Sequence, residues 1–527
     1  MWKMRQALMA TLMAAGAALS AFPLAAQEIP RFPIVRFNVA GNTLLPQSVI
    51  DEAVAPFIGP KQTFGDVQQA LEALEARYRR LGYTTINVIL PEQVLERGEV
   101  LLNVVEGRLK DIRISGQKYY DEDNIRATLP TLIEGESPIV HDVSANLRIA
   151  NENPVKNLKL QLKPGDRDED IHAEIQVTDE RPWKVGLTLE NTGSIQTGRN
   201  RLGFSFQHAN LWNRDHILTA QYQTSPEKPN DVKVYALSYR VPLYSIGDAI
   251  DFYATQSNVN AGTISLGANS PINLAISGSG VAYGGRYSLN LRRQGNFEHQ
   301  LVFGLDNKLS QNSIGAGAVQ LGNDITTRPL LFQYNGRWQV EASELSWYGG
   351  LVRNLPGGEF GDQSDFDRLP RVAPANFSLL RYGLTANHAY TSDWQVRFVL
   401  GGQWTNRPLI PGEQFGIGGA GSVRGFQERE IADDKGLQTS FEVYTPELCQ
   451  PLGGEHRCRA LAFVDSGGVY SADREKSREH VASTGLGFRY NLGKQASFQT
   501  DYGHVLQGGG SQSRGDWRVH ARLGVFF

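Results

Sequence analysis

The sequence predicts two α+β repeats followed by an all-β barrel of 16 antiparallel strands. Three observations support this fold class: an apolar segment near the first residue, a hydrophobic period of two from Pro182 onward, and no later apolar run long enough for a membrane-spanning helix. An exported chain of this kind that lies in a membrane crosses it as β-strands, because a closed barrel satisfies its own backbone groups.

The first 26 residues resemble a secretory signal peptide. Two basic residues in the first five positions precede the almost wholly apolar residues 7–20, and Ala25 and Ala26 offer a small-residue cleavage site. A signal anchor is the alternative, but the apolar core is shorter than the ~20 residues that a spanning helix needs. We therefore expect cleavage after Ala26 and export of the mature chain.

The composition excludes several classes of protein. Lys and Arg total 52 against 55 Asp and Glu, a net charge of −3 that argues against a nucleic-acid-binding protein. Two cysteines among 527 residues exclude a disulfide scaffold and a cysteine-rich metal protein. The 55 glycines, spread without a collagen period, are typical of a large β-protein.

Residues 31–107 and 108–180 show the same order of elements: strand, two helices and two strands. In the first repeat, Thr63 and Asp66 form a helix start and Gly82 ends that helix. The expected elements of the first repeat are 35–39, 46–58, 63–81, 84–90 and 99–105. Those of the second are 110–115, 121–129, 140–150, 156–163 and 170–178. We interpret this order as a tandem repeat of one supersecondary plan.

The barrel prediction covers residues 182–527. One face of each expected strand is apolar and the other polar, as in the final strand, where Arg518, His520 and Arg522 share the polar face. A soluble sandwich also alternates, but its strands average about five or six residues. The expected strands are 182–191, 200–209, 214–224, 231–241, 248–257, 280–292, 296–306, 329–338, 345–354, 377–388, 393–405, 436–447, 459–470, 481–492, 496–507 and 517–527.

The connections between these strands are alternately short and long. Short periplasmic turns and long outside loops are typical of outer-membrane barrels. The alternation places both the repeats and the end of the chain in the periplasm, and it makes 406–435 the longest outside loop.

Motifs for catalysis, cofactors and metals are absent or out of context. Gly416, Gly418 and Gly421 spell Gly-x-Gly-x-x-Gly, but a dinucleotide site needs that run between a strand and a helix. We expect no enzymatic activity, no cofactor and no metal site. Cys449 and Cys458 flank the turn after the twelfth strand, where they either pair in an oxidising compartment or remain two inert thiols.

One constellation of residues is specific. The longest loop carries the tetrapeptide Val423, Arg424, Gly425 and Phe426. The next strand but one places Phe463, Asp465 and Gly467 on the lumenal face. The tetrapeptide resembles the Val/Ile-Arg-Gly-Phe/Tyr motif of the BamA superfamily, and the strand resembles its Phe-x-Asp-x-Gly partner.

With two repeats and 527 residues, the chain resembles the TpsB transporters of two-partner secretion, the haemolysin secretion/activation family. The repeats then resemble POTRA domains, and the residues that carry this likeness are Gly82-Tyr83, Pro91-Glu92-Gln93, Val105-Glu106-Gly107-Arg108, Leu147, Asn151, Pro154 and Leu162-Lys163-Pro164-Gly165. The resemblance covers the whole mature chain.

The resemblance implies a monomeric outer-membrane translocase in contact with lipid. Its POTRA domains would bind an unfolded exoprotein partner, such as a filamentous-haemagglutinin-like β-helix, and the barrel pore would export it. In the loop, Arg424 would pair with Asp465 on the wall, Gly425 would allow a tight turn and Phe426 would pack beside it. An assembly factor for other barrels is the alternative, although two repeats are few for one. A diffusion porin has no use for the repeats or the motif.

Many family members carry an N-terminal helix that plugs the pore. Here we expect only residues 27–31 between the cleavage site and the first repeat, too few for such a helix. We therefore expect the sixth outside loop, 406–435, to occlude the resting pore alone, or the pore to be leakier.

Overall fold

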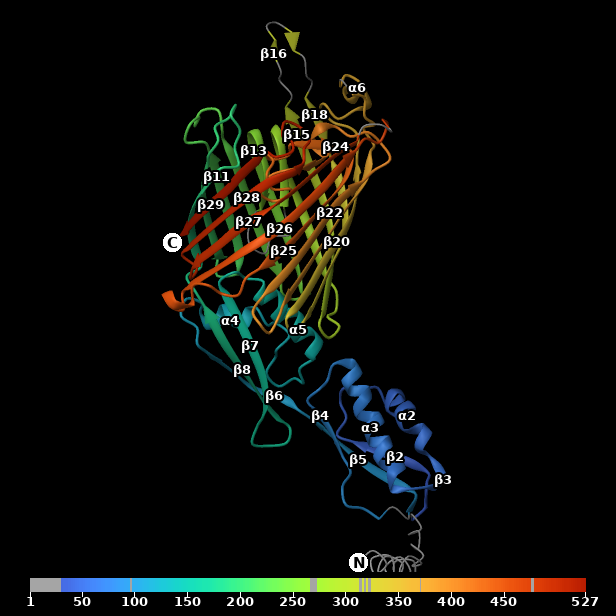
Figure 1. Ribbon diagram of the computed structural model, residues 1–527. Helices are drawn as coiled ribbons and strands as arrows, with labels where there is room; N and C mark the ends of the chain where they lie inside the picture. Colours follow the sequence, from blue (N-terminus) through green and yellow to red (C-terminus); the bar gives the residue numbers. More distant parts are fainter. Residues whose placement is uncertain are drawn as a thin grey trace, which may run out of the picture. The chain divides into compact units, whose positions relative to one another are not determined.

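The computed structural model describes residues 30–94, 97–265, 273–311, 315–316, 319–320, 324–369, 371–474 and 478–527 (Figure 1). The expected signal peptide and parts of several expected outside loops lie outside these ranges. The chain divides into two compact units. One comprises residues up to 110 with 135–139 and 164–171, and the other comprises the rest.

The first repeat forms a three-stranded sheet with two helices on one face. The sheet order is β2-β5-β4, with β2 (Arg36–Ala40) parallel to β5 (Glu99–Glu106) and β4 (Ile86–Ile89) antiparallel to it. The helices are α2 (Gln47–Val54), continued by a 3₁₀ turn at Ala55–Phe57, and α3 (Phe64–Leu81). A small pair, β1 (Phe32–Ile34) with β3 (Gly59–Gln62), was not predicted. The expected order of elements is present throughout.

The ends of α3 follow from local chemistry. Thr63 and Asp66 exchange side-chain and backbone hydrogen bonds in a capping box, which satisfies amides that the first turn leaves without partners. Gly82 ends the helix with φ of 98°, a left-handed conformation that only glycine adopts without strain.

The second repeat repeats this plan. Its sheet order is β6-β8-β7, formed by β6 (Arg108–Ser115), β8 (Asp170–Asp179) and β7 (Lys156–Pro164). Its helices are α4 (Glu122–Ala127) and α5 (Val140–Asn151). Strand β7 therefore lies at one edge of the sheet.

Both repeats use the same device to fix the loop after their first strand. In the first, the Glu106 carboxylate accepts hydrogen bonds from the Thr43 and Leu44 amides at 2.6 and 3.1 Å. In the second, the Asp179 carboxylate accepts from three successive amides, those of residues 118–120, at 2.7–3.0 Å. An acid at the end of the last strand thus replaces water as the partner of these amides.

This device predicts a pH-dependent stability of the first repeat. Burial alone would raise the pKa of Glu106, but hydrogen bonds from Thr43, Leu44 and Arg108 outweigh burial and lower it. A carboxylate with a lowered pKa stabilises the fold above its unfolded pKa, and that stability is lost as the pH falls through the folded pKa. We expect Glu106→Gln to destabilise the repeat by about 2 kcal/mol at pH 7.

The measurement is amide hydrogen exchange of peptides from residues 30–106 in the full-length protein, at pH 7 and near pH 4. The difference between Glu106→Gln and the natural protein should shrink at the lower pH. Glu99→Gln is the matched control, because Glu99 lies in the same strand with an exposed partner, Arg36, at 2.7 Å. An equal loss of protection in both variants would contradict the prediction.

The rest of the chain forms a closed antiparallel barrel, which confirms the predicted 16 strands. They are β9 (Trp183–Glu190), β10 (Arg201–Leu211), β11 (His216–Thr224), β12 (Val234–Leu243), β13 (Asp248–Ser265), β14 (Asn273–Asn290), β15 (Phe297–Gln311), β19 (Pro329–Val340), β20 (Ser343–Asn354), β21 (Ser378–Ala389), β22 (Gln395–Trp404), β25 (Lys435–Tyr444), β26 (His456–Tyr470), β27 (Arg478–Leu492), β28 (Ala496–Gln507) and β29 (Trp517–Phe526). A short segment, β18 (Ile325–Thr327), precedes β19 and pairs with the far end of β15. Strand β29 pairs with β9 and closes the barrel.

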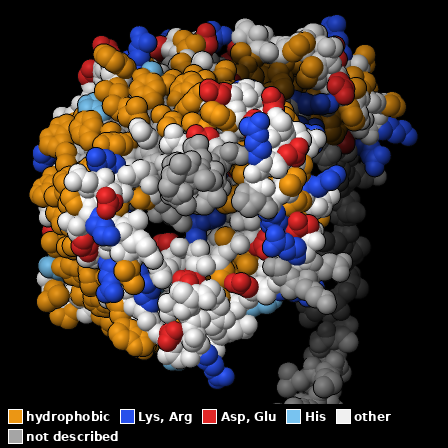
Figure 2. Space-filling model, turned by 90° about the horizontal axis from the view of Figure 1, so that it is seen from above, with side chains coloured by type: hydrophobic (Ala, Val, Ile, Leu, Met, Phe, Trp, Pro, Cys, Tyr) orange, Lys and Arg blue, Asp and Glu red, His pale blue; other side chains and the backbone are white. Residues whose placement is uncertain are grey.

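Side chains divide between the two faces of the barrel as the sequence predicts. Large apolar residues of the strands are exposed on the outside, among them Trp183, Trp404 and Trp517. Figure 2 looks onto the loop end, where hydrophobic side chains follow much of the outer circumference and charged ones gather inside it. Among the described residues, no helix is long and apolar enough to cross a membrane.

Candidate pore-loop site

The sixth outside loop, between β22 and β25, is folded rather than open. It contains a 3₁₀ turn at Pro411–Glu413 and a hairpin of β23 (Phe415–Ile417) with β24 (Ile431–Asp433). We call this segment, residues 405–434, the pore loop. The hairpin was not predicted from the sequence, because strands of three residues carry too little alternation to detect.

The tetrapeptide lies between the two hairpin strands, and the structure brings its Arg424 against the wall residue Asp465. The Arg424 Nε and Nη2 atoms donate to the two Asp465 oxygens, both at 2.8 Å, and the Arg424 amide donates to the same carboxylate at 3.0 Å. The Arg424 side chain is 3% exposed and that of Asp465 is fully buried. This is a bidentate, charge-assisted contact of the strong kind.

Two more carboxylates surround the same guanidinium. Arg424 Nη1 lies 2.8 Å from Glu442 on β25 and 3.4 Å from Asp501 on β28. Ser440 hydroxyl accepts from Arg424 Nη2 at 3.1 Å and donates to Asp465 at 2.6 Å. One cation of the loop therefore joins acids from three wall strands, β25, β26 and β28.

The aromatic ring of Phe463 completes this contact. Its centroid lies 3.5 Å from the Arg424 guanidinium carbon, a stacked cation–π arrangement. Phe463, Asp465 and Arg424 thus form one unit, in which the ring covers one face of the guanidinium and the acid holds its edge.

The glycines of the two motifs make room for the loop. Gly425 has φ of 96°, and its amide donates to His520 Nε2 at 3.1 Å. A Cβ at Gly467 would come 2.9 Å from the Ile417 side chain, and one at Gly503 would come 2.5 Å from the Gly425 amide. A side chain at either wall position would displace the loop from the wall.

An apolar cluster packs the loop tip against the strands behind it. Phe426 and Val423 are fully buried. The cluster consists of Ile417, Val423, Phe426 and Ile431 from the loop with Val469, Val481 and Val505 from the wall. Burial of these side chains adds a non-polar attachment beside the ionic one.

The base of the loop has two ionic attachments that the motif does not include. Buried Glu413 accepts from Lys308 on β15 and Arg381 on β21, both at 2.9 Å. Arg371, in the fifth outside loop, bonds to Asp434 and also contacts Asp433 and Asp473. The pore loop is therefore held at its tip and at both ends.

A cavity of about 900 Å³ remains between the pore loop and the barrel wall. Side chains of both signs line it, including Arg286, Asp306, Arg429 and Glu428. The loop narrows the lumen without filling it.

Glu442, Asp501, Ser440 and Gly503 were not predicted as site residues, and His520 was predicted only as a residue of the polar face. Each lies on a wall strand at a position that alternation assigns to the lumen, so the polar face contained the signal. What the sequence does not state is the register between strands, and register decides which lumenal acids reach the loop.

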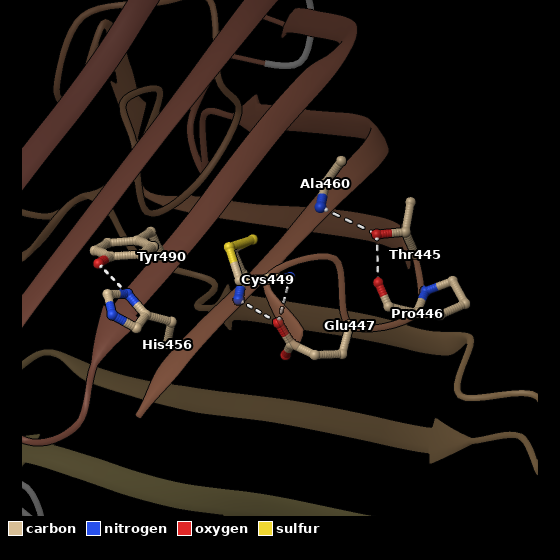
Figure 3. Close-up of a disulfide and its surroundings, with 8 residues drawn as sticks. Thr445, Pro446, Glu447, Cys449, His456, Ala460 and Tyr490 are labelled. Atoms are coloured by element: carbon tan, nitrogen blue, oxygen red, sulfur yellow. Dashed lines mark hydrogen bonds between the residues drawn. A yellow bond between two sulfur atoms is a disulfide. The ribbon is translucent and has the colours of Figure 1, made fainter. Parts of the chain in front are cut away.

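Cys449 and Cys458 are joined in a disulfide in the turn between β25 and β26 (Figure 3). The Glu447 carboxylate accepts from the amides of both cysteines, at 3.1 and 2.6 Å. Among the described residues, these three side chains are the one cluster of His, Cys, Asp or Glu close enough to share a metal ion. The disulfide leaves no thiolate to bind such an ion.

Comparison with known proteins decides the family. Residues 170–490, more than half of the chain, match the haemolysin secretion/activation protein family ShlB/FhaC/HecB, and residues 32–107 match the ShlB-type POTRA domain. The chain belongs to this family. It is a TpsB transporter of the outer membrane, serving two-partner secretion, and it is not an enzyme. The fold class predicted from the alternation and the repeats, and the family, function and location implied by the motifs, are thereby confirmed.

Individual relatives span most of the chain. The outer membrane transporter CdiB of Escherichia coli O6:K15:H31 is 24% identical over 518 residues, which cover 95% of this chain and 83% of that protein. The heme/hemopexin transporter protein HuxB of Haemophilus influenzae (strain 86-028NP) is 21% identical over 443 residues, covering 81% and 74%.

Solved structures of CdiB share the fold. CdiB from Escherichia coli superposes with a TM-score of 0.77 at 21% identity, covering 97% of this chain and 93% of that one. CdiB from Acinetobacter baumannii gives 0.70 at 16% identity, covering 99% and 98%. The TpsB transporter described here therefore has the fold of solved CdiB transporters along nearly its full length.

Proposed function

We propose that this TpsB transporter captures an unfolded exoprotein with its POTRA repeats and exports it through the barrel after the pore loop moves. The observation that carries the proposal is the pore loop, held inside a closed barrel by Arg424 and Asp465. A passive channel needs no such segment. We also propose the divisions 1–26, 31–107, 108–180 and 182–527 for signal peptide, two POTRA domains and barrel.

An exposed sheet edge supports capture of an unfolded chain. Strand β7 has β8 on one side and no further strand paired to it among the described residues. Alternate residues of β7 are exposed. An extended segment could add to this edge, with backbone hydrogen bonds supplying affinity and side-chain contacts supplying selectivity.

We propose that the partner is a large secreted protein of the filamentous-haemagglutinin type, with a β-helical fold. The names of the relatives support a dedicated partner, since CdiB and HuxB are each named as transporters, HuxB for heme/hemopexin. We further propose that the transporter acts as a monomer, because one chain closes the whole barrel.

The test is a comparative secretome of three host strains: one with the gene intact, one with it deleted, and one carrying Arg424→Ala. We expect one large protein to vanish from the medium or cell surface on deletion, and its export to fall in the Arg424 strain. If secretion is unchanged while many outer-membrane proteins fall together, the proposal is wrong and the chain acts as an assembly factor.

A further inference from the structure

The contact between the second POTRA repeat and the barrel contains a fully buried ion pair. Lys156, at the start of β7, bonds to Asp215 in the turn between β10 and β11, and their side chains are 0% and 1% exposed. Lys156 Nζ also donates to Asn124 Oδ1 at 2.9 Å, and the Tyr244 hydroxyl donates to Asp215 at 2.6 Å. These groups belong to one compact unit of the chain.

The second repeat also bonds to the backbone of three successive stretches at this end of the barrel. Asn153 donates to the Ala209 carbonyl at 2.8 Å, Asn146 to the Tyr244 carbonyl at 2.6 Å, and Arg148 to the Leu291 carbonyl at 3.0 Å. These acceptors lie at or near the ends of β10, β12 and β14. The helix α5 and the segment after it therefore follow the rim of the barrel.

The turn that carries Asp215 has an unusual backbone. Trp212, Asn213 and Asp215 have φ of 62°, 56° and 58°. This left-handed conformation is sterically unfavourable for residues that have a Cβ. Strained conformations persist where surrounding contacts hold them. Here Asn213 donates to both Asp121 oxygens of the second repeat, at 2.8 and 3.0 Å.

We propose that the second POTRA repeat stays docked to the barrel rim throughout transport, and that Lys156 and Asp215 are the positioning residues that hold it there. Undocking would have to break this ion pair together with the three bonds to the rim carbonyls. A charge left buried without its partner is strongly unfavourable, so removal of either ion should weaken the docking. Docking would keep the β7 edge, which begins at Lys156, at a fixed place beside the barrel mouth. The inference rests on the proposed function, because it concerns the path of the client.

The experiment combines a disulfide with a broken ion pair. A Cβ at Gly247 would lie 3.0 Å from the Ala145 Cβ, so Ala145→Cys with Gly247→Cys needs only a small shift to form a disulfide between α5 and the rim. Export by the double-cysteine protein is then measured with the disulfide oxidised and with it reduced. Both measurements are made in the otherwise natural protein and in the protein that also carries Lys156→Met. The single cysteine variants control for strain at Gly247, and the natural protein controls for reduction of Cys449–Cys458.

We expect the oxidised double-cysteine protein to export within about twofold of the natural level, and Lys156→Met alone to export about tenfold less. The disulfide should restore export to Lys156→Met, and reduction should remove that rescue. Export is counted per folded transporter in the outer membrane, so that a loss of folded protein does not register as a loss of export. Lys494→Met is the matched control, because its exposed pair with Glu180 joins the same two parts.

Two results would overturn the inference. One is an oxidised disulfide that blocks export until it is reduced, which would mean that the repeat must leave the rim. The other is normal export by Lys156→Met. If Lys156→Met does not accumulate in the membrane, export by the oxidised and the reduced double-cysteine protein still tests whether the repeat stays docked. Failure of the proposed function is distinguishable, because then the natural protein exports no partner while disulfide yield still reports docking.

Discussion

Arg424→Ala should reduce export of the partner about tenfold or more, the largest effect that we expect from a single substitution. The change removes the cation bonded to buried Asp465, whereas Glu442 and Asp501 keep Arg397 and Arg489 at 3.2 and 2.8 Å. Breaking a buried pair costs about 3–5 kcal/mol, because it leaves an unpaired buried charge. We expect the loop tip to detach from the wall. The pore loop then no longer starts from its defined position when the client arrives, and export falls.

The measurement is the amount of exported partner per folded transporter in the outer membrane. Arg522→Ala is the matched control, since Arg522 also lines the lumen but is 52% exposed and lies 3.6 Å from Glu190. Exposed pairs of this kind contribute about 0–1 kcal/mol. Equal losses in the two variants would mean that any lumenal arginine matters and that the loop contact is not special.

Arg424→Lys separates charge from shape. Lysine keeps the positive charge but cannot form the two parallel bonds to Asp465 that the guanidinium forms at 2.8 Å. It also loses the flat contact with the Phe463 ring. We expect export between that of the natural protein and that of the alanine variant.

Much of the fold could be predicted because the sequence states it locally. A period of two survives along each long strand, and Thr63, Asp66 and Gly82 mark one helix at both ends. The short elements were not predicted, because β1, β3, β23 and β24 have only three or four residues each. Alternation needs more positions than these before it differs from chance.

The site could be predicted only where a motif names both partners. Arg424 and Asp465 belong to two recognisable motifs, whereas Glu442 and Asp501 reach the guanidinium through strand register. Arg371 and Asp434, which are 63 residues apart in the chain, join two outside loops by a hydrogen bond. Contacts of this kind depend on the closed barrel and have no local pattern.

The paired acids of the repeats show an intermediate case. Glu106 stands in a motif that the sequence displays, yet its task, binding the amides after β2, is apparent only in three dimensions. Asp179 performs the same task in the second repeat without any shared motif. Similar structural tasks thus outlast similarity of sequence between the two repeats.

Deletion of the pore loop should turn the barrel into an open channel. The intact lumen holds the β23–β24 hairpin, and a cavity of about 900 Å³ is left beside it. Replacing residues 405–434 with a short glycine–serine linker removes the hairpin and the loop's share of the apolar cluster from the lumen. We expect single-channel conductance in a planar bilayer to rise several-fold, because the conducting cross-section grows.

The barrel itself should survive this deletion. The strands pair along their length without the loop, from β22 with β25 round to β29 with β9. Heat-modifiable migration on a gel would verify that the deleted variant is still a closed barrel. A variant with Ser422→Ala alone is the matched control, because it removes one bond from the loop to Gln438 and leaves the loop in place.

The conductance of the intact protein decides between the two expectations for the resting pore. If the pore loop alone closes the pore, the intact protein conducts little and the deletion opens it fully. If the intact protein already conducts through the remaining cavity, the increase on deletion is smaller and the resting pore is leaky. An intact protein and a deletion variant that are equally closed would show that the pore loop is not the obstruction, and the role assigned to Arg424 in holding it there would fail with it.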